Sequence, residues 1–229
     1  MRTNLYVVFD TADFSIRDKG GWVLSLLSLL ERDYNLDRVL SRASSYAYAL
    51  YRRYKSFEYI RKGVHFRKLS KSDKIISMRK FLLLFLSDVL KRYILFALIA
   101  PTDSLYSDDF RRKISQYIIN GLTGYNFVKI YAIFELRDER NREIFARIRE
   151  IFTYTLDQLN IEYSVREADA DFFHILSIAD FMAHAYINRQ RYLINAMRYP
   201  YERFLIEKFA YLIIERLKTH LNKNFVLIE

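Results

Sequence analysis

Short runs of apolar residues, rich in β-branched and aromatic side chains, recur along this chain and predict buried strands. The clearest of these runs are Leu5–Phe9, Tyr93–Ala100 and Phe127–Phe134. A strand buried on both faces needs apolar residues at successive positions, so these runs show little alternation. Asp10 directly follows the first of these segments, and Glu135 directly follows the third. We therefore expect carboxylates at strand ends, where a sheet meets solvent.

Apolar stripes with helical spacing predict the helices of the chain. Ser70 or Ser72 is a suitable N-cap for one of them, and Pro200 suits the start of the last. The predicted helices cover Trp22–Arg32, Lys74–Leu90, Asp108 to Gly121 or Gly124, Asp138–Asn160, Asp171–Asn188 and Pro200 to about Leu221.

Three further segments complete the prediction of local structure. The polar stretch from Asp10 to Gly21 predicts a loop, and Ile161–Val165 predicts a short strand. Apolar and polar residues alternate in several places between Ala43 and Leu69, which predicts two strands, including one at Val64–Leu69. Alanine and leucine in this stretch also permit a helix.

The order of these elements predicts an α/β fold with a mixed sheet flanked by helices. Strand and helix alternate through the second half of the chain, which indicates parallel strands joined by helical crossovers. The meander-like first half indicates antiparallel strands beside them. With 5 Gly and 2 Pro, the chain has little material for flexible linkers. We expect a single domain over residues 1–229, with a C-terminal helical extension from about 190 to 229.

The amino-acid composition limits the chemistry available to the protein and indicates where it is located. The chain contains no cysteine, which excludes disulfides and cysteine-based zinc sites and favours a cytoplasmic location. The apolar run near the N-terminus is too short for a signal peptide. The most apolar window, Phe81–Ala100, is interrupted by Asp88, Lys91 and Arg92, so we expect no membrane partner.

The formal net charge of +10 and the sequence pI of about 9.6 favour a polyanionic partner such as DNA or RNA. Tyr51–Lys74 holds nine basic residues and two acids, a balance of +7, with aromatic residues between them. Basic groups neutralise phosphates and aromatic rings stack on unpaired bases. The alternative is an ordinary solvated strand face. The candidate nucleic-acid-binding residues are Arg52, Arg53, Lys55, Arg61, Lys62, Arg67, Lys68, Tyr54 and Tyr59.

Three acids occupy positions that a sheet could bring together. Asp10 and Glu135 follow two strands whose ends coincide if the strands are parallel neighbours. Asp180 lies in an apolar part of its helix, one turn before His184. Grouped carboxylates repel one another, and Mg²⁺ or Mn²⁺, which prefer oxygen ligands, relieve that repulsion. The candidate catalytic and metal-binding acids are Asp10, Glu135 and Asp180, supported by Asp13, Asp171 and His184.

Each of these residues also has a simpler structural explanation. Asp10 is suited to a turn or a helix cap, and Glu135 to a surface ion pair with a nearby arginine. Asp180 could form a structural salt bridge, and His184 could be an ordinary core or surface histidine. Asp171 is well placed to cap the helix that follows it. The set of acids is more informative than any single member.

Three segments of the chain are, in order, VVFDTAD, IYAIFELRDER and HILSIADFMA. Their order resembles an uncharacterised family called domain of unknown function 3800, whose fold is similar to that of ribonuclease H and retroviral integrase. The sequence departs from the family pattern after Asp10, where Thr11, Ala12 and Asp13 stand in place of Glu-Ser-Gly, and it has Glu135 where aspartate is common. The resemblance implies a ribonuclease H-like domain with a metal-dependent nuclease-like site at Asp10, Glu135 and Asp180.

These observations favour a nuclease or nucleic-acid-processing protein that uses Mg²⁺ or Mn²⁺ and a carboxylate cluster. Two alternatives stay open at this point. One is a protein on the same fold that binds nucleic acid without catalysis. The other is a structural or partner-binding protein of a mobile element or defence system. The apolar face of the helix at Tyr201–Leu221 would either complete the core or form a homodimer.

Overall fold

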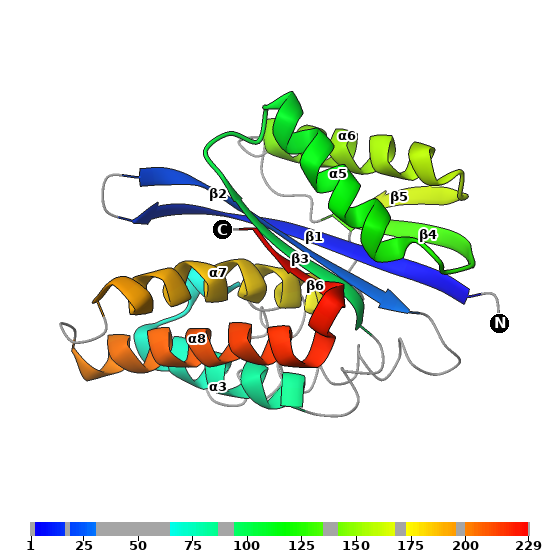
Figure 1. The fold of residues 1–229 in the computed structure, drawn as a ribbon. Coiled ribbons are helices and arrows are strands. Elements are labelled where there is room, and N and C mark those ends of the chain that lie inside the picture. The colour runs from blue at the N-terminus through cyan, green and yellow to red at the C-terminus, as the bar shows by residue number, and fades with distance from the viewer. Residues whose placement is uncertain are drawn as a thin grey trace.

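The computed structural model describes residues 3–16, 19–30, 65–86, 94–134, 142–167, 173–195 and 200–228 (Figure 1). The first half contributes β1 (Thr3–Ile16), β2 (Lys19–Leu30), the 3₁₀ turn η1 (Phe66–Lys68), α3 (Lys71–Leu86), β3 (Ile94–Thr102) and α5 (Asp108–Leu122). The second half contributes β4 (Phe127–Phe134), α6 (Arg142–Leu159), β5 (Tyr163–Glu167), α7 (Phe173–Asn195), α8 (Tyr201–Leu221), η3 (Asn222–Asn224) and β6 (Phe225–Leu227).

The strands form one six-stranded sheet in the order β5-β4-β1-β2-β3-β6. Its centre is an antiparallel meander, because β2 pairs antiparallel with both β1 and β3. β4 joins the other side of β1 as a parallel neighbour, and β5 is parallel to β4. β6 is parallel to β3 at the opposite edge. The predicted α/β class and mixed sheet are therefore confirmed.

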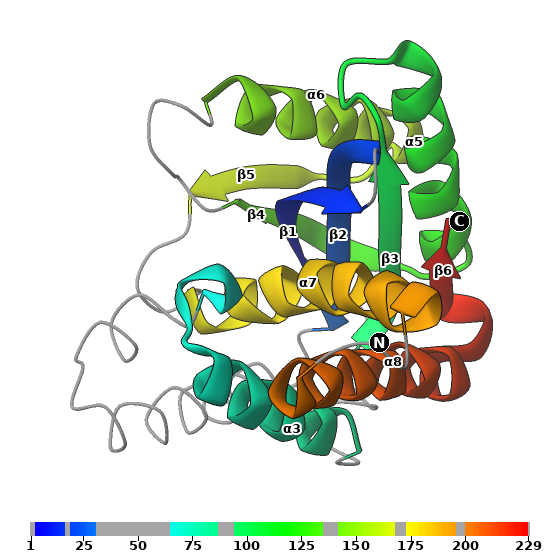
Figure 2. The same ribbon diagram turned by 90° about the vertical axis from the view of Figure 1, so that its left-hand side faces the viewer.

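Helices cover both faces of the sheet (Figures 1 and 2). α5 and α6 pack on one face with Leu5, Val7 and Phe9 of β1, and α7, α8 and α3 pack on the other face with Val8 and Ala12. The two sets alternate along β1 because successive side chains of a strand point to opposite faces of the sheet. α7 lies next to the sheet and crosses its central strands, whereas α3 lies farther out.

Most of the predicted elements are present. The apolar runs form β1, β3 and β4, and the helices expected around α3, α5, α6, α7 and α8 occur with shifted ends. Ser70 caps α3, since its hydroxyl accepts the Asp73 amide at 3.3 Å and donates to the Asp73 carboxylate at 2.6 Å. This reciprocal pair resembles a capping box and fixes where α3 starts. Residues after 190 complete α7, then form α8 and β6, so this part of the chain packs into the core and extends the sheet.

The helix predicted at Trp22–Arg32 is wrong, because this segment forms β2 as far as Leu30. The loop predicted from Asp10 to Gly21 is also wrong where it is described, since β1 continues to Ile16 and β2 begins at Lys19. Asp10 therefore lies within a strand rather than at its end. Leucine is a good helix former, but intrinsic propensities are small, and burial between two strands and two helical layers overrides this one.

The strand predicted at Val64–Leu69 is wrong over Phe66–Lys68, which forms η1. Phe66 and Leu69 are buried there while Arg67 and Lys68 are exposed, so the apparent alternation reflects two apolar residues that flank a short turn. The part of the predicted two-strand segment before His65 lies outside the described residues. None of the described helices is both long enough and apolar enough to span a membrane.

The contact between α5 and β3 gives a direct test of the packing. A Cβ atom at Gly121 would lie 2.3 Å from Cδ2 of Phe96, whereas at Gly20 the nearest atom would be 3.6 Å away. We expect Gly121→Ala to lower the free energy of unfolding by about 1–3 kcal/mol, because overpacking forces the helix or the ring to move. Gly20→Ala is the matched control and should change it little. Chemical denaturation measures both, and equal effects would contradict this packing.

Candidate functional site

Asp10 follows the last described pair between β1 and β4. That pair is Phe9 with Phe134, and Asp10 is the next residue along β1. Its side chain lies on the same face as Val8 and Ala12, because alternate strand residues share a face. This is the face that α7 covers. Oδ1 of Asp10 accepts the amide of Thr11 at 2.7 Å.

A buried hydroxyl joins Asp10 to the helix above it. Ser25 is the cross-strand partner of Asp10 and is fully buried. Its hydroxyl donates to the carbonyl oxygen of Ala179 at 2.6 Å and lies 3.3 Å from the carbonyl oxygen of Asp10. Ala179 immediately precedes Asp180 in α7. One hydroxyl thus brings the backbone at Asp10 and the backbone next to Asp180 together, although the two are far apart in sequence.

The carboxylate of Asp180 is held by η1 and by its own helix. The residue is only 3% exposed, and Oδ2 accepts the amide of Phe66 at 2.7 Å. Oδ1 lies 3.6 Å from Nε2 of His184, too far for a good hydrogen bond but close enough for electrostatic attraction to a protonated ring. Because each carboxylate oxygen has more than one acceptor position, these contacts leave Asp180 able to accept further donors or a cation.

His184 and Asn188 continue the line that starts at Asp180, as their spacing predicts. The His184 ring packs on Phe66 with the ring centroids 4.9 Å apart. Asn188 is buried and its side-chain amide donates to the carbonyl oxygen of His184 at 2.8 Å. Both residues line a pocket beside η1. This stripe of α7 therefore leads from the buried acid to an open cavity.

The remaining candidates fall into two groups. Asp13 is exposed at the outer part of β1 and forms an ion pair with Arg67, with Oδ1 and the guanidinium 2.7 Å apart. Lys68 is exposed on the same turn. The others lie outside the described residues: Glu135, Asp171, Arg52, Arg53, Tyr54, Lys55, Tyr59, Arg61 and Lys62.

The pocket beside η1 has a volume of about 390 Å³ and a strongly basic lining. β1, η1, α3, α7 and α8 all contribute to its wall. Asp13 is the one acid among the described residues that line it. The basic side chains in the wall are Arg67, Lys71, Lys74, Arg191 and Arg203, with His184 beside them. Five cations and one acid give a formal balance of +4, so this pocket is suited to an anion.

Two basic groups in this wall influence each other directly. Partial burial, and then repulsion from the Arg191 guanidinium, lower the pKa of Lys74 below its usual value. The Lys74 ammonium also lies 5.4 Å from the centre of the Phe66 ring. The folded chain therefore holds cations from α3 and α7 close together, which is unfavourable until an anion comes between them.

Arg203 is positioned by a buried acid of the next helical turn. Nε of Arg203 donates to Oε1 of Glu207 at 3.1 Å, and Glu207 is only 1% exposed. Burial raises the pKa of the Glu207 carboxyl above its usual value, an effect that the Arg203 guanidinium opposes. The buried carboxylate of Glu207 therefore fixes the position of the Arg203 guanidinium, which belongs to the lining of the pocket.

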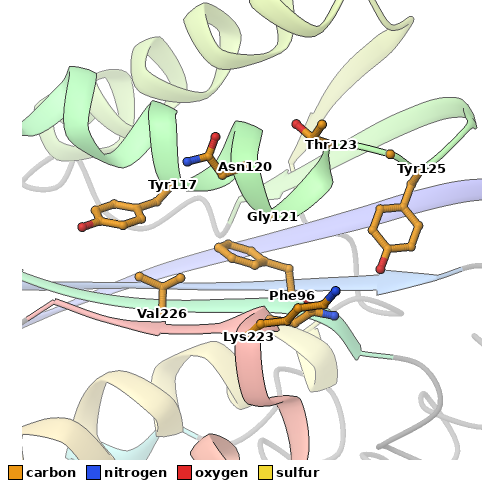
Figure 3. A pocket seen from close by; sticks show the side chains of 10 residues that line it. Phe96, Tyr117, Asn120, Gly121, Thr123, Tyr125, Lys223 and Val226 are labelled. Carbon is orange, nitrogen blue, oxygen red and sulfur yellow. The ribbon is translucent and has the colours of Figure 1, made fainter.

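A second pocket of about 390 Å³ lies on the other side of the sheet, between α5 and β3 (Figure 3). Phe96, Tyr117 and Val226 form its apolar part, and Asn120 and Lys223 stand at its edge. Its described lining contains one cation and no acid. The pocket beside η1 is therefore the better candidate for binding a charged ligand.

Part of this basic pocket was not identified from the sequence. Lys71 and Lys74 belong to the basic segment that was recognised, but Arg191 and Arg203 were not singled out. Arg191 was detectable in principle, because it extends the line of Asp180, His184 and Asn188 by one more turn. Arg203 could not be detected from the sequence, since only the packing of α8 against α7 brings it to the pocket.

The described residues provide only part of the predicted metal site. They contain no group of three or more acids and histidines placed to hold an ion. Two of the three predicted acids, Asp10 and Asp180, belong to facing elements, and Glu135 follows directly after Phe134 in the sequence. Their carboxylates are the hard oxygen donors that Mg²⁺ and Mn²⁺ prefer, so the donor chemistry fits such an ion. No protein-family model, curated protein or solved structure matches the chain.

The bond from Ser25 to α7 can be tested against a matched bond within the sheet. Ser28 is equally buried in β2 and donates to the carbonyl oxygen of Phe96 at 3.0 Å. We expect Ser25→Ala to cost about 1 kcal/mol and to speed amide hydrogen exchange in α7. Ser28→Ala should have a similar cost without selectively loosening α7. Equal acceleration of exchange in α7 by both variants would show that Ser25 does not hold this helix.

The buried Glu207 predicts a pH dependence of stability. Its carboxyl holds a proton more tightly in the folded chain, so stability falls as pH rises from the unfolded value, near 4.5, through the raised folded pKa. Glu207→Gln should remove this decrease, measured as the free energy of unfolding at a series of pH values. Glu202→Gln, an exposed position on the same helix, should keep the wild-type profile. An unchanged slope in Glu207→Gln would contradict this assignment.

Proposed function

We propose that this chain is a nucleic-acid-processing protein of ribonuclease H-like architecture that acts on phosphodiesters with a bound divalent cation. The observation that carries the proposal is the contact through Ser25, which brings Asp10 and the backbone next to Asp180 to one place on the sheet. Ser25 links the backbone of Asp10 to the helix that carries Asp180, and that helix also lines a cationic pocket, an arrangement that suits a reaction on an anionic substrate.

The arrangement of the strands supports the architectural part of the proposal. An antiparallel meander of three strands, followed by two parallel strands added next to the first, is the arrangement expected of a ribonuclease H-like sheet. The resemblance to domain of unknown function 3800 rests on the segments that carry Asp10, Glu135 and Asp180. Parallel pairing of β1 with β4 meets the condition under which the first two of these would share a sheet edge.

In this proposal Asp10, Asp180 and Glu135 would hold the ion. A bound Mg²⁺ or Mn²⁺ would polarise the phosphodiester and lower the pKa of a bound water. The Phe66 amide holds the Asp180 carboxylate in a fixed orientation through its hydrogen bond to Oδ2. His184 lies between this carboxylate and the pocket, where its ring can donate to a substrate oxygen.

The second candidate is a protein that binds nucleic acid on this surface without cleaving it. The net charge of +10 and the basic pocket favour it independently of the acids. Such a protein would show affinity that falls with salt and would retain it after the acids are neutralised.

Cleavage by purified protein distinguishes the two candidates. We expect Mn²⁺-dependent cleavage of labelled single-stranded or double-stranded DNA or RNA, assayed separately on gels. Asp10→Asn and Asp180→Asn should each reduce the rate by at least the roughly 10- to 100-fold loss that even outer-shell changes at metal sites cause. Asp109→Asn, at an exposed acid of α5, should keep the full rate. Thermal melting identifies any variant that merely fails to fold.

Cleavage that survives both substitutions would overturn the assignment of the acids. Salt-sensitive binding with no cleavage on any of these substrates, with or without Mn²⁺, would favour the non-catalytic candidate.

A further inference from the structure

The basic pocket beside η1 gathers its cations from four separate elements. Arg67 comes from η1, Lys71 and Lys74 from α3, Arg191 from α7 and Arg203 from α8. Solvated basic surfaces usually follow one helix or one strand, whereas here folding itself concentrates the charge around one partly open pocket. Asp13 and Glu207 offset part of this charge through Arg67 and Arg203, whereas Lys74 and Arg191 repel each other.

The chemistry of the lining selects the kind of anion. Guanidinium groups bind phosphoryl oxygens through paired N–H donors, and ammonium groups add point charge. His184 and the buried Asn188 add polar groups to the same wall. A volume of about 390 Å³ corresponds to on the order of ten water molecules, so it admits more than one phosphate-sized group. A formal balance of +4 exceeds what a single carboxylate would neutralise.

We propose that this pocket binds phosphoryl groups of a nucleic-acid strand and holds the strand beside Asp180 and His184. This inference rests on the proposed function for its choice of nucleic acid as the ligand, and it adds a binding subsite that is separate from the acids. His184 marks the boundary, since it contacts the pocket on one side and lies 3.6 Å from Asp180 on the other.

The lowered pKa of Lys74 is consistent with this subsite. Burial and the nearby Arg191 disfavour the ammonium form in the free protein. A phosphoryl group between α3 and α7 would offset that repulsion and favour the ammonium form. The short ion pair of Arg67 with Asp13 is exposed, so a bound phosphate can displace it at small cost.

The test measures binding in EDTA, where cleavage cannot take place. A labelled single strand of about 16 nucleotides is titrated with wild-type protein and with the double variant Lys71→Gln/Arg191→Gln. We expect at least a tenfold loss of affinity and a salt dependence shallower by about 1.4 log units per log unit of salt, from two lost phosphate contacts. The charge-conserving variant Lys71→Arg/Arg191→Lys should retain most of the affinity.

The matched control removes the same charge from another surface. Arg112 and Lys113 are exposed on α5, which covers the opposite face of the sheet. Arg112→Gln/Lys113→Gln should leave both affinity and salt dependence close to wild type. Equal losses in the two double variants would mean that total charge alone drives binding, which would overturn the subsite. Unchanged binding in Lys71→Gln/Arg191→Gln would overturn it as well.

Two further arms identify the source of the phosphoryl group. Inorganic pyrophosphate should compete with the strand for wild-type protein, and failure to compete would contradict the subsite. Stronger binding of a 5′- or 3′-phosphorylated strand than of the same strand with hydroxyl ends would assign the pocket to a terminal phosphate. Equal binding, still lost in the pocket variant, would assign it to the internal backbone. Because no arm measures cleavage, the subsite and the nuclease proposal can fail independently.

Discussion

The bond from the Ser25 hydroxyl to the carbonyl oxygen of Ala179 is the polar contact that sets the position of α7 on the sheet. Inside a dry core an unpaired hydroxyl is costly, so a fully buried serine fixes its partner's position more strictly than an apolar residue would. The Ala179 carbonyl can accept this bond in addition to its helical one, because it has two lone pairs. α7 is therefore held in one register over β1 and β2.

Because α7 is held in this position, its different faces contact different parts of the structure. Ala179 contacts the sheet through Ser25, and Asp180, one residue further, fixes η1 through the Phe66 amide. His184 and Arg191 follow along the helix and reach the basic pocket. A rotation of α7 would change all three contacts together. The position of the acid, the position of η1 and the composition of the pocket are in this sense consequences of one docking arrangement.

Much of this architecture could be predicted from the sequence, for reasons that differ between elements. β1, β3 and β4 were recognisable because strands buried on both faces have continuous apolar runs. The segment that forms β2 was misread, since its leucines fit a helix equally well and its two buried serines looked polar. Ser25 finds its acceptors on α7 and β1, and Ser28 finds its acceptor on β3, which no local pattern reveals. The line from Asp180 to Asn188 was predictable from spacing, whereas Arg203 reached the pocket only through tertiary packing.

We propose that Asp10 on β1 and Asp180 on α7 bind the same divalent cation. The most direct measurement is anomalous diffraction from a crystal of this chain soaked in Mn²⁺. The account predicts an anomalous peak coordinated by carboxylate oxygens of Asp10 and Asp180, with Glu135 as a third ligand. A well-ordered region in which the two acids face apart, or in which Mn²⁺ binds elsewhere and leaves them without an ion, would contradict it.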